Sequence, residues 1–206
     1  MEIRERFEEY FSKIKRVGKD KILEYLNKSD YFKAPASTIY HSSMEGGLVY
    51  HSIKVVEYLE KLVKNNNLVF EREDSIYVIG LLHDICKTYF YEVDYRNVKN
   101  EQGIWEKRPY YKVKDLMPVG VHGDKSVMLL LKLGLELTTE EIYCIRYHMG
   151  AYESKEVMNS LGEAKHRCNN ILWVQLADEL ATLEEDKEQK DLKNNKNILI
   201  IQKDMI

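Results

Sequence analysis

The adjacent pair His83-Asp84 is the part of the chain best suited to chemistry, because it ends the apolar stretch 76–82, where a core helix should remain apolar. Burying a carboxylate without a partner is costly, so something must compensate Asp84. Further imidazole and carboxylate side chains stand far away in the chain, on or beside helical segments with apolar stripes: His51, His122, His148 and Asp178. Six such residues converging on one point would form a metal site, and a metal site on a helical scaffold suggests hydrolytic chemistry.

The types of donor narrow the choice of metal. Imidazole nitrogen and carboxylate oxygen together suit Mn, Fe, Co, Ni or Zn, whereas Mg and Ca use oxygen ligands almost alone. We therefore expect a divalent transition metal, with one or two ions per chain. Cys86 and Cys144 lie near the expected ligands, but free cysteine more often serves as a small buried hydrophobe, so both are left out. His41 and His166 lack both a stripe position and a flanking motif, which favours a structural role.

Apolar residues spaced by threes and fours predict the helices that must position these side chains. His51 and Asp178 fall on the apolar faces of their helices, and the stripe of a third helix ends in His83, so all three point toward the core. A helix that begins near Thr138 would carry His148 at the end of its apolar row. Besides the helix that begins near Thr138, helices are predicted over residues 3–14, 19–26, 47–64, 74–87, 123–133 and 162–185.

Residues 89–99 and 104–114 are rich in Tyr, Val, Phe and Trp and flank the polar turn 100–103, which predicts a β-hairpin. The expected fold is an all-α bundle with a β-hairpin insertion at about 89–114. A chain of this length is expected to form one domain, residues 1–206. Within it we expect an N-terminal helical cap (1–40), a metal-binding core (46–182) and a charged C-terminal extension (184–206). The charged run 184–197 would continue a helix into solvent or form a mobile connector, and the apolar tail 197–201 would be a short strand or a docked end.

Composition limits the partners and the compartment. A formal net charge of -3 over 206 residues provides no basic field to hold long nucleic acid, although small anionic substrates are compatible with it. Three cysteines without C-x-x-C spacing indicate a reducing compartment. The N-terminus lacks the apolar core of a secretion signal, and no apolar run approaches the roughly 18 residues of a membrane span. We therefore expect a cytoplasmic protein with no membrane partner; the sequence does not indicate an oligomeric state.

The order of the six residues resembles that of the HD superfamily of metal-dependent phosphohydrolases, which is named for its adjacent His-Asp pair. The resemblance runs from about residue 46 to residue 182. Residues 46–51 (GGLVYH) are similar to the G-G-L-x-x-H opening of the branch that includes bacterial 3′-to-5′ exoribonucleases, and residues 82–87 (LHDICK) are similar to its L-H-D-x-x-K core.

The resemblance implies an HD-type helical bundle and a division of the ligands into two sets. One metal would be held by four residues: His51, His83, Asp84 and Asp178. A second would be held by His122 and His148, with Asp84 bridging the two ions and positioning a metal-activated water. Lys87 and Lys125 would bring positive charge to a substrate phosphate, although Lys87 could also cap its helix. His148 stands alone where some two-metal relatives carry paired histidines.

These features together predict a metal-dependent phosphohydrolase, a phosphomonoesterase or phosphodiesterase, acting on a nucleotide or a short nucleic-acid end. A small nucleotide is preferred over long RNA, because the chain has no room for a separate nucleic-acid-binding domain. The alternatives are an exoribonuclease-like nuclease, a nucleotide-sensing HD module without turnover, and a purely structural metal site. The tyrosine-rich hairpin could stack on a nucleobase as a substrate lid, although Tyr is also common in strands for structural reasons.

Overall fold

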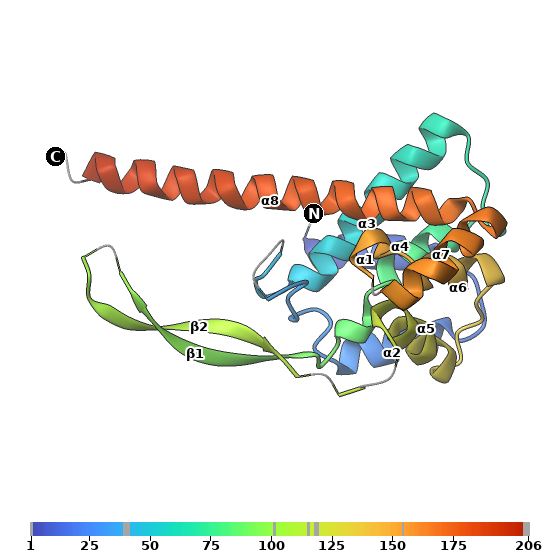
Figure 1. Ribbon diagram of the computed structural model, residues 1–206, viewed down its shortest axis with the longest axis horizontal. Helices are drawn as coiled ribbons and strands as arrows, with labels where there is room; N and C mark the ends of the chain where they lie inside the picture. The colour runs from blue at the N-terminus through green and yellow to red at the C-terminus, as the bar shows by residue number, and fades with distance from the viewer. Residues whose placement is uncertain are drawn as a thin grey trace.

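The computed structural model describes residues 2–38, 42–100, 102–114, 116–117, 120–153 and 155–203, with side chains as far as Asp191 except residue 156. Its elements follow in the order α1 (Ile3–Ser12), α2 (Lys19–Lys28), α3 (Gly47–Asn66), α4 (Ser75–Leu82), η1 (Ile85–Lys87), β1 (Tyr91–Lys99), β2 (Trp105–Val113), α5 (His122–Lys132), α6 (Thr139–Arg146), η2 (Gly150–Tyr152), α7 (Lys155–Arg167) and α8 (Asn170–Lys203). The predicted all-α fold with a hairpin insertion is confirmed (Figure 1). His41 lies outside the described residues.

Helix α3 lies against both α4 and α8 and anchors the hydrophobic core. A Cβ atom on Gly80 of α4 would come 2.5 Å from the side chain of Val56, so the two helices approach closely only because residue 80 is glycine. Phe7 and Ile22 of α1 and α2 are fully buried in the same cluster as Leu48 of α3. The N-terminal helices therefore extend the core that surrounds the ligand-bearing helices.

The hairpin leaves the helical body as a two-stranded antiparallel arm (Figure 1). Its register pairs Tyr91 with Val113 near the body and Lys99 with Trp105 near the tip. In the turn, the side chain of Asn100 accepts hydrogen bonds from two backbone amides, which stabilises the reversal of the chain. The arm buries few of its own side chains.

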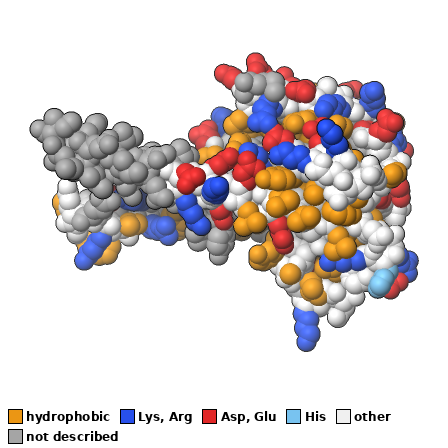
Figure 2. All heavy atoms as spheres, turned by 90° about the horizontal axis from the view of Figure 1, so that it is seen from above, with side chains coloured by type: hydrophobic (Ala, Val, Ile, Leu, Met, Phe, Trp, Pro, Cys, Tyr) orange, Lys and Arg blue, Asp and Glu red, His pale blue; other side chains and the backbone are white. Residues whose placement is uncertain are grey.

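Helix α8 crosses the body beside α3 and then continues past it on the same side as the hairpin (Figure 1). Leu172, Leu176 and Leu183 are exposed on the part of α8 that covers the body. On the face of the body shown in Figure 2, hydrophobic side chains are interspersed with charged groups of both signs. The described residues visible on this face therefore form no continuous basic patch, in keeping with the slightly negative net charge. In the described part of the chain, no helix is both long and apolar enough to cross a membrane.

Several helix limits differ from the prediction. The helix expected over 74–87 ends at Leu82, and a 3-10 turn follows it. The helix expected over 162–185 is two helices, α7 and α8, with a break at residues 168–169. The tail 197–201 continues α8 as a helix rather than forming a strand. Apolar spacing locates a helix but does not register the local hydrogen bonds that end it.

Candidate metal centre

Separate elements bring the six predicted ligands to one place. His51 comes from the middle of the apolar face of α3, and Asp178 comes from α8, which packs beside it. The other four occupy helix ends: His83 and Asp84 follow α4, His122 begins α5, and His148 lies two residues after α6. The imidazoles of His51, His83 and His148 are about 1% exposed. Residues that are distant in sequence thus form one buried cluster.

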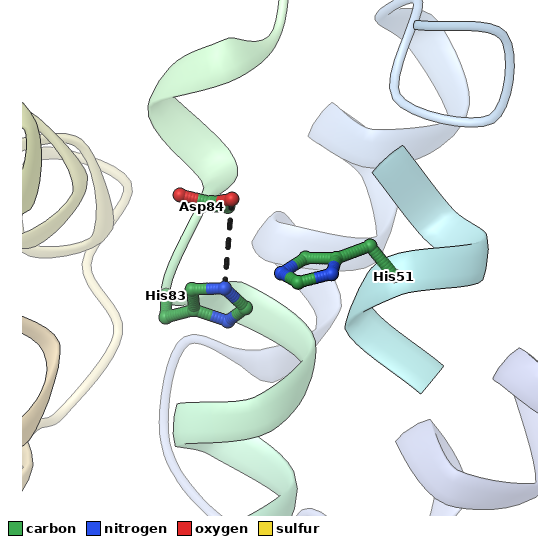
Figure 3. A group of neighbouring side chains, drawn as sticks. All are labelled: His51, His83 and Asp84. Carbon is green, nitrogen blue, oxygen red and sulfur yellow. Dashed lines mark ion pairs between the residues drawn. The ribbon is translucent and has the colours of Figure 1, made fainter. Parts of the chain in front are cut away.

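The first part of the cluster contains His51, His83 and Asp84, whose potential ligand atoms all lie within 4.8 Å of one another (Figure 3). His51 Nε2 lies 2.9 Å from Asp178 Oδ1, and His83 Nε2 lies 3.9 Å from the same oxygen. His83 Nε2 is also 3.5 Å from Asp84 Oδ2. Two imidazole nitrogens and two carboxylates therefore face a common point.

The second part of the cluster lies on the other oxygen of Asp84. His122 Nε2 contacts Asp84 Oδ1, and His148 Nε2 lies 3.4 Å from that atom. The rings of His122 and His148 are 5.5 Å apart between centroids, and those of His83 and His148 are 4.8 Å apart. The Asp84 carboxylate is thus placed between two groups of histidines, with one oxygen toward each.

Two of these histidines are oriented by the ends of their helices. His83 Nδ1 donates to the carbonyl of Gly80 at 3.0 Å, and His148 Nδ1 donates to the carbonyl of Ile145 at 2.7 Å. Both carbonyls belong to the last turn of a helix, where backbone oxygens lack helical partners. When each ring is neutral, its proton lies on Nδ1 and Nε2 presents its lone pair to the cluster.

The hydrogen bonding of these two Nε2 atoms indicates whether the cluster fits a metal. Neither His83 Nε2 nor His148 Nε2 has a hydrogen-bond partner among the described residues, although both are buried. A buried polar atom without a partner is destabilising unless something absent from the protein chain binds it. The donor set of imidazole nitrogens and carboxylates suits a divalent transition metal, so the residues fit such an ion.

Local backbone features make this convergence feasible. A Cβ atom on Gly123 would lie 2.2 Å from the carbonyl oxygen of Arg146, so glycine lets the start of α5 approach the end of α6. That approach brings His122 beside His148. Asp84 has φ -105° and ψ 16°, in the sparsely populated bridge region where many active-site residues lie.

The electrostatic environment explains the protonation states of the cluster. Burial lowers the pKa of His51, but the carboxylates of Glu185 and Asp178 outweigh it and raise this pKa to about 10. Burial opposes ionisation of Asp84, yet the neighbouring Lys87 and His83 hold its pKa well below its ordinary value. Without a metal, His51 is therefore charged at neutral pH and Asp84 is ionised. Metal binding at His51 must displace a proton.

The predicted substrate-binding residue Lys87 is partly exposed, as are two of the predicted ligands. The side chains of Asp178, His122 and Lys87 are 18%, 20% and 12% exposed, against about 1% for His83. Lys87 Nζ lies 2.6 Å from Asp84 Oδ2. Burial lowers the pKa of Lys87, but Asp84 raises it by more, so the ammonium keeps its proton.

Lys125 lies in the first turn of α5, with its Nζ 5.9 Å from the centre of the Phe90 ring.

Two residues near the ligands were not predicted from the sequence. Cys86 Sγ lies 3.3 Å from His122 Nδ1, and its sulfur forms a second potential ligand group with Asp84 and His122. Burial and the nearby Asp84 raise the pKa of this thiol to about 12, so it is neutral without a metal. Glu185, placed in the charged extension by its sequence, contacts His51. Cys86 was left out of the predicted site as a small buried hydrophobe, and its position two residues after Asp84 was the available signal. Glu185 lies two helical turns after Asp178.

Comparison with known protein families agrees with this geometry. The HD domain model matches residues 48–183, more than half of the chain. The searches of curated proteins and of solved structures returned no match. The match covers all six predicted ligands and does not distinguish the exoribonuclease branch. The chain therefore belongs to the HD-domain family, whose members bind divalent metals and are typically metal-dependent hydrolases.

Proposed function

We propose that this protein is a metal-dependent phosphohydrolase that cleaves a phosphoester of a nucleotide or of a short nucleic-acid end. The observation that carries the proposal is the position of Asp84, with one carboxylate oxygen toward His83 and the other toward His122 and His148. A carboxylate shared by two divalent ions has its oxygens divided in this way. Family membership supports the reaction class.

The ligands divide into two sets in this proposal. One metal would be held by His51, His83, Asp84 and Asp178. A second would be held by His122 and His148, with Asp84 shared and Cys86 within reach. Bound Mn, Fe, Co, Ni or Zn would activate a water molecule and offset the charge that develops on the phosphoryl oxygens. Asp84 is the catalytic carboxylate, because it would position that water between the two sets.

Lys87 is proposed as the principal phosphate-binding group. Its ammonium already lies against Asp84, and its side chain is 12% exposed. A substrate phosphate would offer Lys87 a second anion, and a charge-assisted hydrogen bond would hold the ester against the proposed metal ligands. Lys125 would contribute a second positive charge from the start of α5.

A short single-stranded end is a substrate worth testing beside mononucleotides because of the hairpin. Tyr95 and Trp105 are 62% and 65% exposed, and the register places both on the face of the hairpin that also carries Lys99 and Lys107. Exposed rings interleaved with cations bind unpaired bases by stacking and phosphates by charge. This arrangement supports the exoribonuclease-like alternative, restricted to short substrates.

The test is hydrolysis of a substrate panel by metal-free protein reconstituted with Mn²⁺, Co²⁺ or Zn²⁺. The panel contains dNTPs, nucleoside monophosphates, cyclic nucleotides and short oligomers, with release of phosphate or nucleoside as the readout. We expect turnover of at least one class that requires added metal. Tight binding without release under every metal would instead identify a nucleotide-sensing module. Chelation that unfolds the protein before activity is lost would identify a structural metal site.

A further inference from the structure

Glu185 is a buried carboxylate near the start of the charged run 184–197, and its side chain contacts His51 and Ser42. It is 1% exposed and lies on α8, two helical turns after Asp178. Both of its oxygens are engaged: Oε1 lies 2.9 Å from His51 Nδ1, and Oε2 accepts a 2.6 Å hydrogen bond from the Ser42 hydroxyl. Burial of an ionisable carboxylate costs free energy, so the buried position of Glu185 calls for a structural or functional explanation.

The two ring nitrogens of His51 point at two different acids. Nδ1 faces Glu185, and Nε2 faces Asp178 at 2.9 Å. A proton on Nδ1 donated to Glu185 leaves Nε2 as the nitrogen that can bind a metal. Carboxylates in this position fix the tautomer and the ring plane of a metal-binding histidine and increase its basicity. A carbonyl in the last turn of a helix orients His83 and His148, whereas His51 lies in the second turn of α3, far from the end of that helix.

Ser42 is itself held by its surroundings. It is 1% exposed, has a left-handed backbone with φ 47°, and its carbonyl accepts a hydrogen bond from Ala36. A Cβ atom on Gly47 would lie 1.9 Å from that carbonyl oxygen, so glycine is needed where α3 begins. The hydroxyl that contacts Glu185 is therefore presented from a fixed segment of backbone.

We propose that Glu185, held by Ser42, is the positioning residue that sets the tautomer and orientation of His51 for metal binding. Both residues fall outside residues 48–183, the segment that matches the family model. The inference rests on the proposed metal site at His51, and it deepens that proposal by extending the site into the start of the C-terminal charged run.

The neighbouring acids on α8 provide matched controls. Glu184 Oε1 lies 2.7 Å from Lys54 Nζ, and Glu184 Oε2 accepts a hydrogen bond from Tyr58 at 2.6 Å. Glu188 contacts Lys54 at 3.3 Å. These acids bind α8 to α3 as Glu185 does, but their contacts are to Lys54, Tyr58 and Tyr50. A loss of helix docking and a loss of histidine positioning can therefore be separated.

The experiment measures the dissociation constant for Mn²⁺ by calorimetry and for Co²⁺ by visible absorption, on the full chain. Glu185→Ala is expected to weaken metal binding by about 10- to 100-fold, the range seen when such an orienting partner is removed. Glu185→Gln keeps an acceptor oxygen for Nδ1–H and should recover part of the loss. Glu184→Ala should lower the melting temperature with a metal affinity within about two-fold of the wild type, because it removes only a docking contact.

A second variant covers the case in which Glu185→Ala does not fold. Ser42→Ala removes only the hydroxyl on Oε2, and its metal affinity should fall between those of the wild type and Glu185→Gln. Equal metal affinity in the wild type, Glu185→Gln and Ser42→Ala would overturn the inference, as would an equal loss in Glu184→Ala. Metal affinity is measured without substrate. A wild type that binds metal but hydrolyses no phosphoester would therefore end the proposed function and leave this inference standing.

Discussion

The buried candidate metal centre and the exposed hairpin arm hold their side chains in place in opposite ways. In the centre, His83 and His148 are nearly inaccessible and each is oriented by a backbone carbonyl. In the arm, Tyr95 and Trp105 project mainly into solvent. The centre is determined by many contacts at once, whereas the arm is held chiefly by its own strand pairing. The candidate metal centre therefore suits chemistry that requires fixed geometry, and the arm suits adaptable contact with a substrate.

The largest expected contrast comes from removing one carboxylate in each region. Asp84→Ala takes away the group shared by both histidine sets and should reduce turnover by roughly a thousand-fold or more, as loss of a key transition-state group does. Asp94→Ala in the hairpin removes an exposed acid that contacts Tyr110, and turnover of a mononucleotide should stay within about two-fold. Phosphate release under saturating metal measures both.

Metal content provides the control for this pair of variants. Asp84→Ala should bind less metal while retaining a helical circular dichroism spectrum, because the surrounding core is unchanged. Full turnover by Asp84→Ala, or an equal loss in both variants, would remove the distinction between the two regions.

Residue types and their order indicated the six candidate ligands, which the fold brings close together, and physical reasons account for what the sequence did not indicate. His51 and Asp178 interrupt apolar stripes, and a polar residue on a buried face signals a partner in any helix. The end of α4 was predicted too late, because the helix ends at Leu82 with no Gly or Pro after it to mark the end, and His83 Nδ1 donates to the Gly80 carbonyl in its last turn. Local hydrogen bonds of this type cannot be read from periodicity.

Glu185 is a contact that the sequence could not predict. A glutamate within the run 184–197 is indistinguishable by type from its exposed neighbours, and only the crossing of α8 over α3 identifies which acid meets His51. The hairpin was predicted correctly because its strand propensities and polar turn are local properties. Its role stays a hypothesis, since exposed tyrosines are compatible with both a strand preference and a binding surface.

The next contrast lies within the centre, between its two histidine sets. His148→Gln removes a ligand of the second set only, so we expect the metal content to fall from about two ions per chain to about one if both sites fill. His51→Gln should affect the first set in the same manner. Elemental analysis of protein purified without added metal, and again after reconstitution, counts the ions.

A metal content of one ion per wild-type chain would show that His122 and His148 are neighbours of Asp84 and not ligands of a second metal. Exposed His166 provides a control for the loss of an imidazole, because it lies on α7 outside the cluster. His166→Gln should leave the metal content unchanged.

A smaller effect is expected from pH on the metal-free protein. The pKa of His51 is raised to about 10 in the fold, from an ordinary value of about 6.5. Its contribution to stability is therefore fully present below about pH 6.5 and is lost as pH rises toward 10. The melting temperature of chelated protein should fall by several degrees across this window, and His51→Gln should show a shallower fall. Identical pH profiles for the two proteins would show that His51 is not charged in the fold.

Substitutions in the arm are expected to have the smallest effect on the fold. Their effect on function should also be the most selective. The double variant Tyr95→Ser and Trp105→Ser removes two exposed rings, so melting temperature and metal content should change little. If the rings stack on unpaired bases, KM for a short oligonucleotide should rise by roughly ten-fold or more, since each stacked base contributes about 1–3 kcal/mol. KM for a mononucleotide should be unchanged, because a single nucleotide at the metal ligands would not reach the tip of the arm. An equal rise in KM for both substrates would show that the rings maintain the structure of the site rather than stack on bases. An unchanged KM for both substrates would show that the arm does not bind substrate.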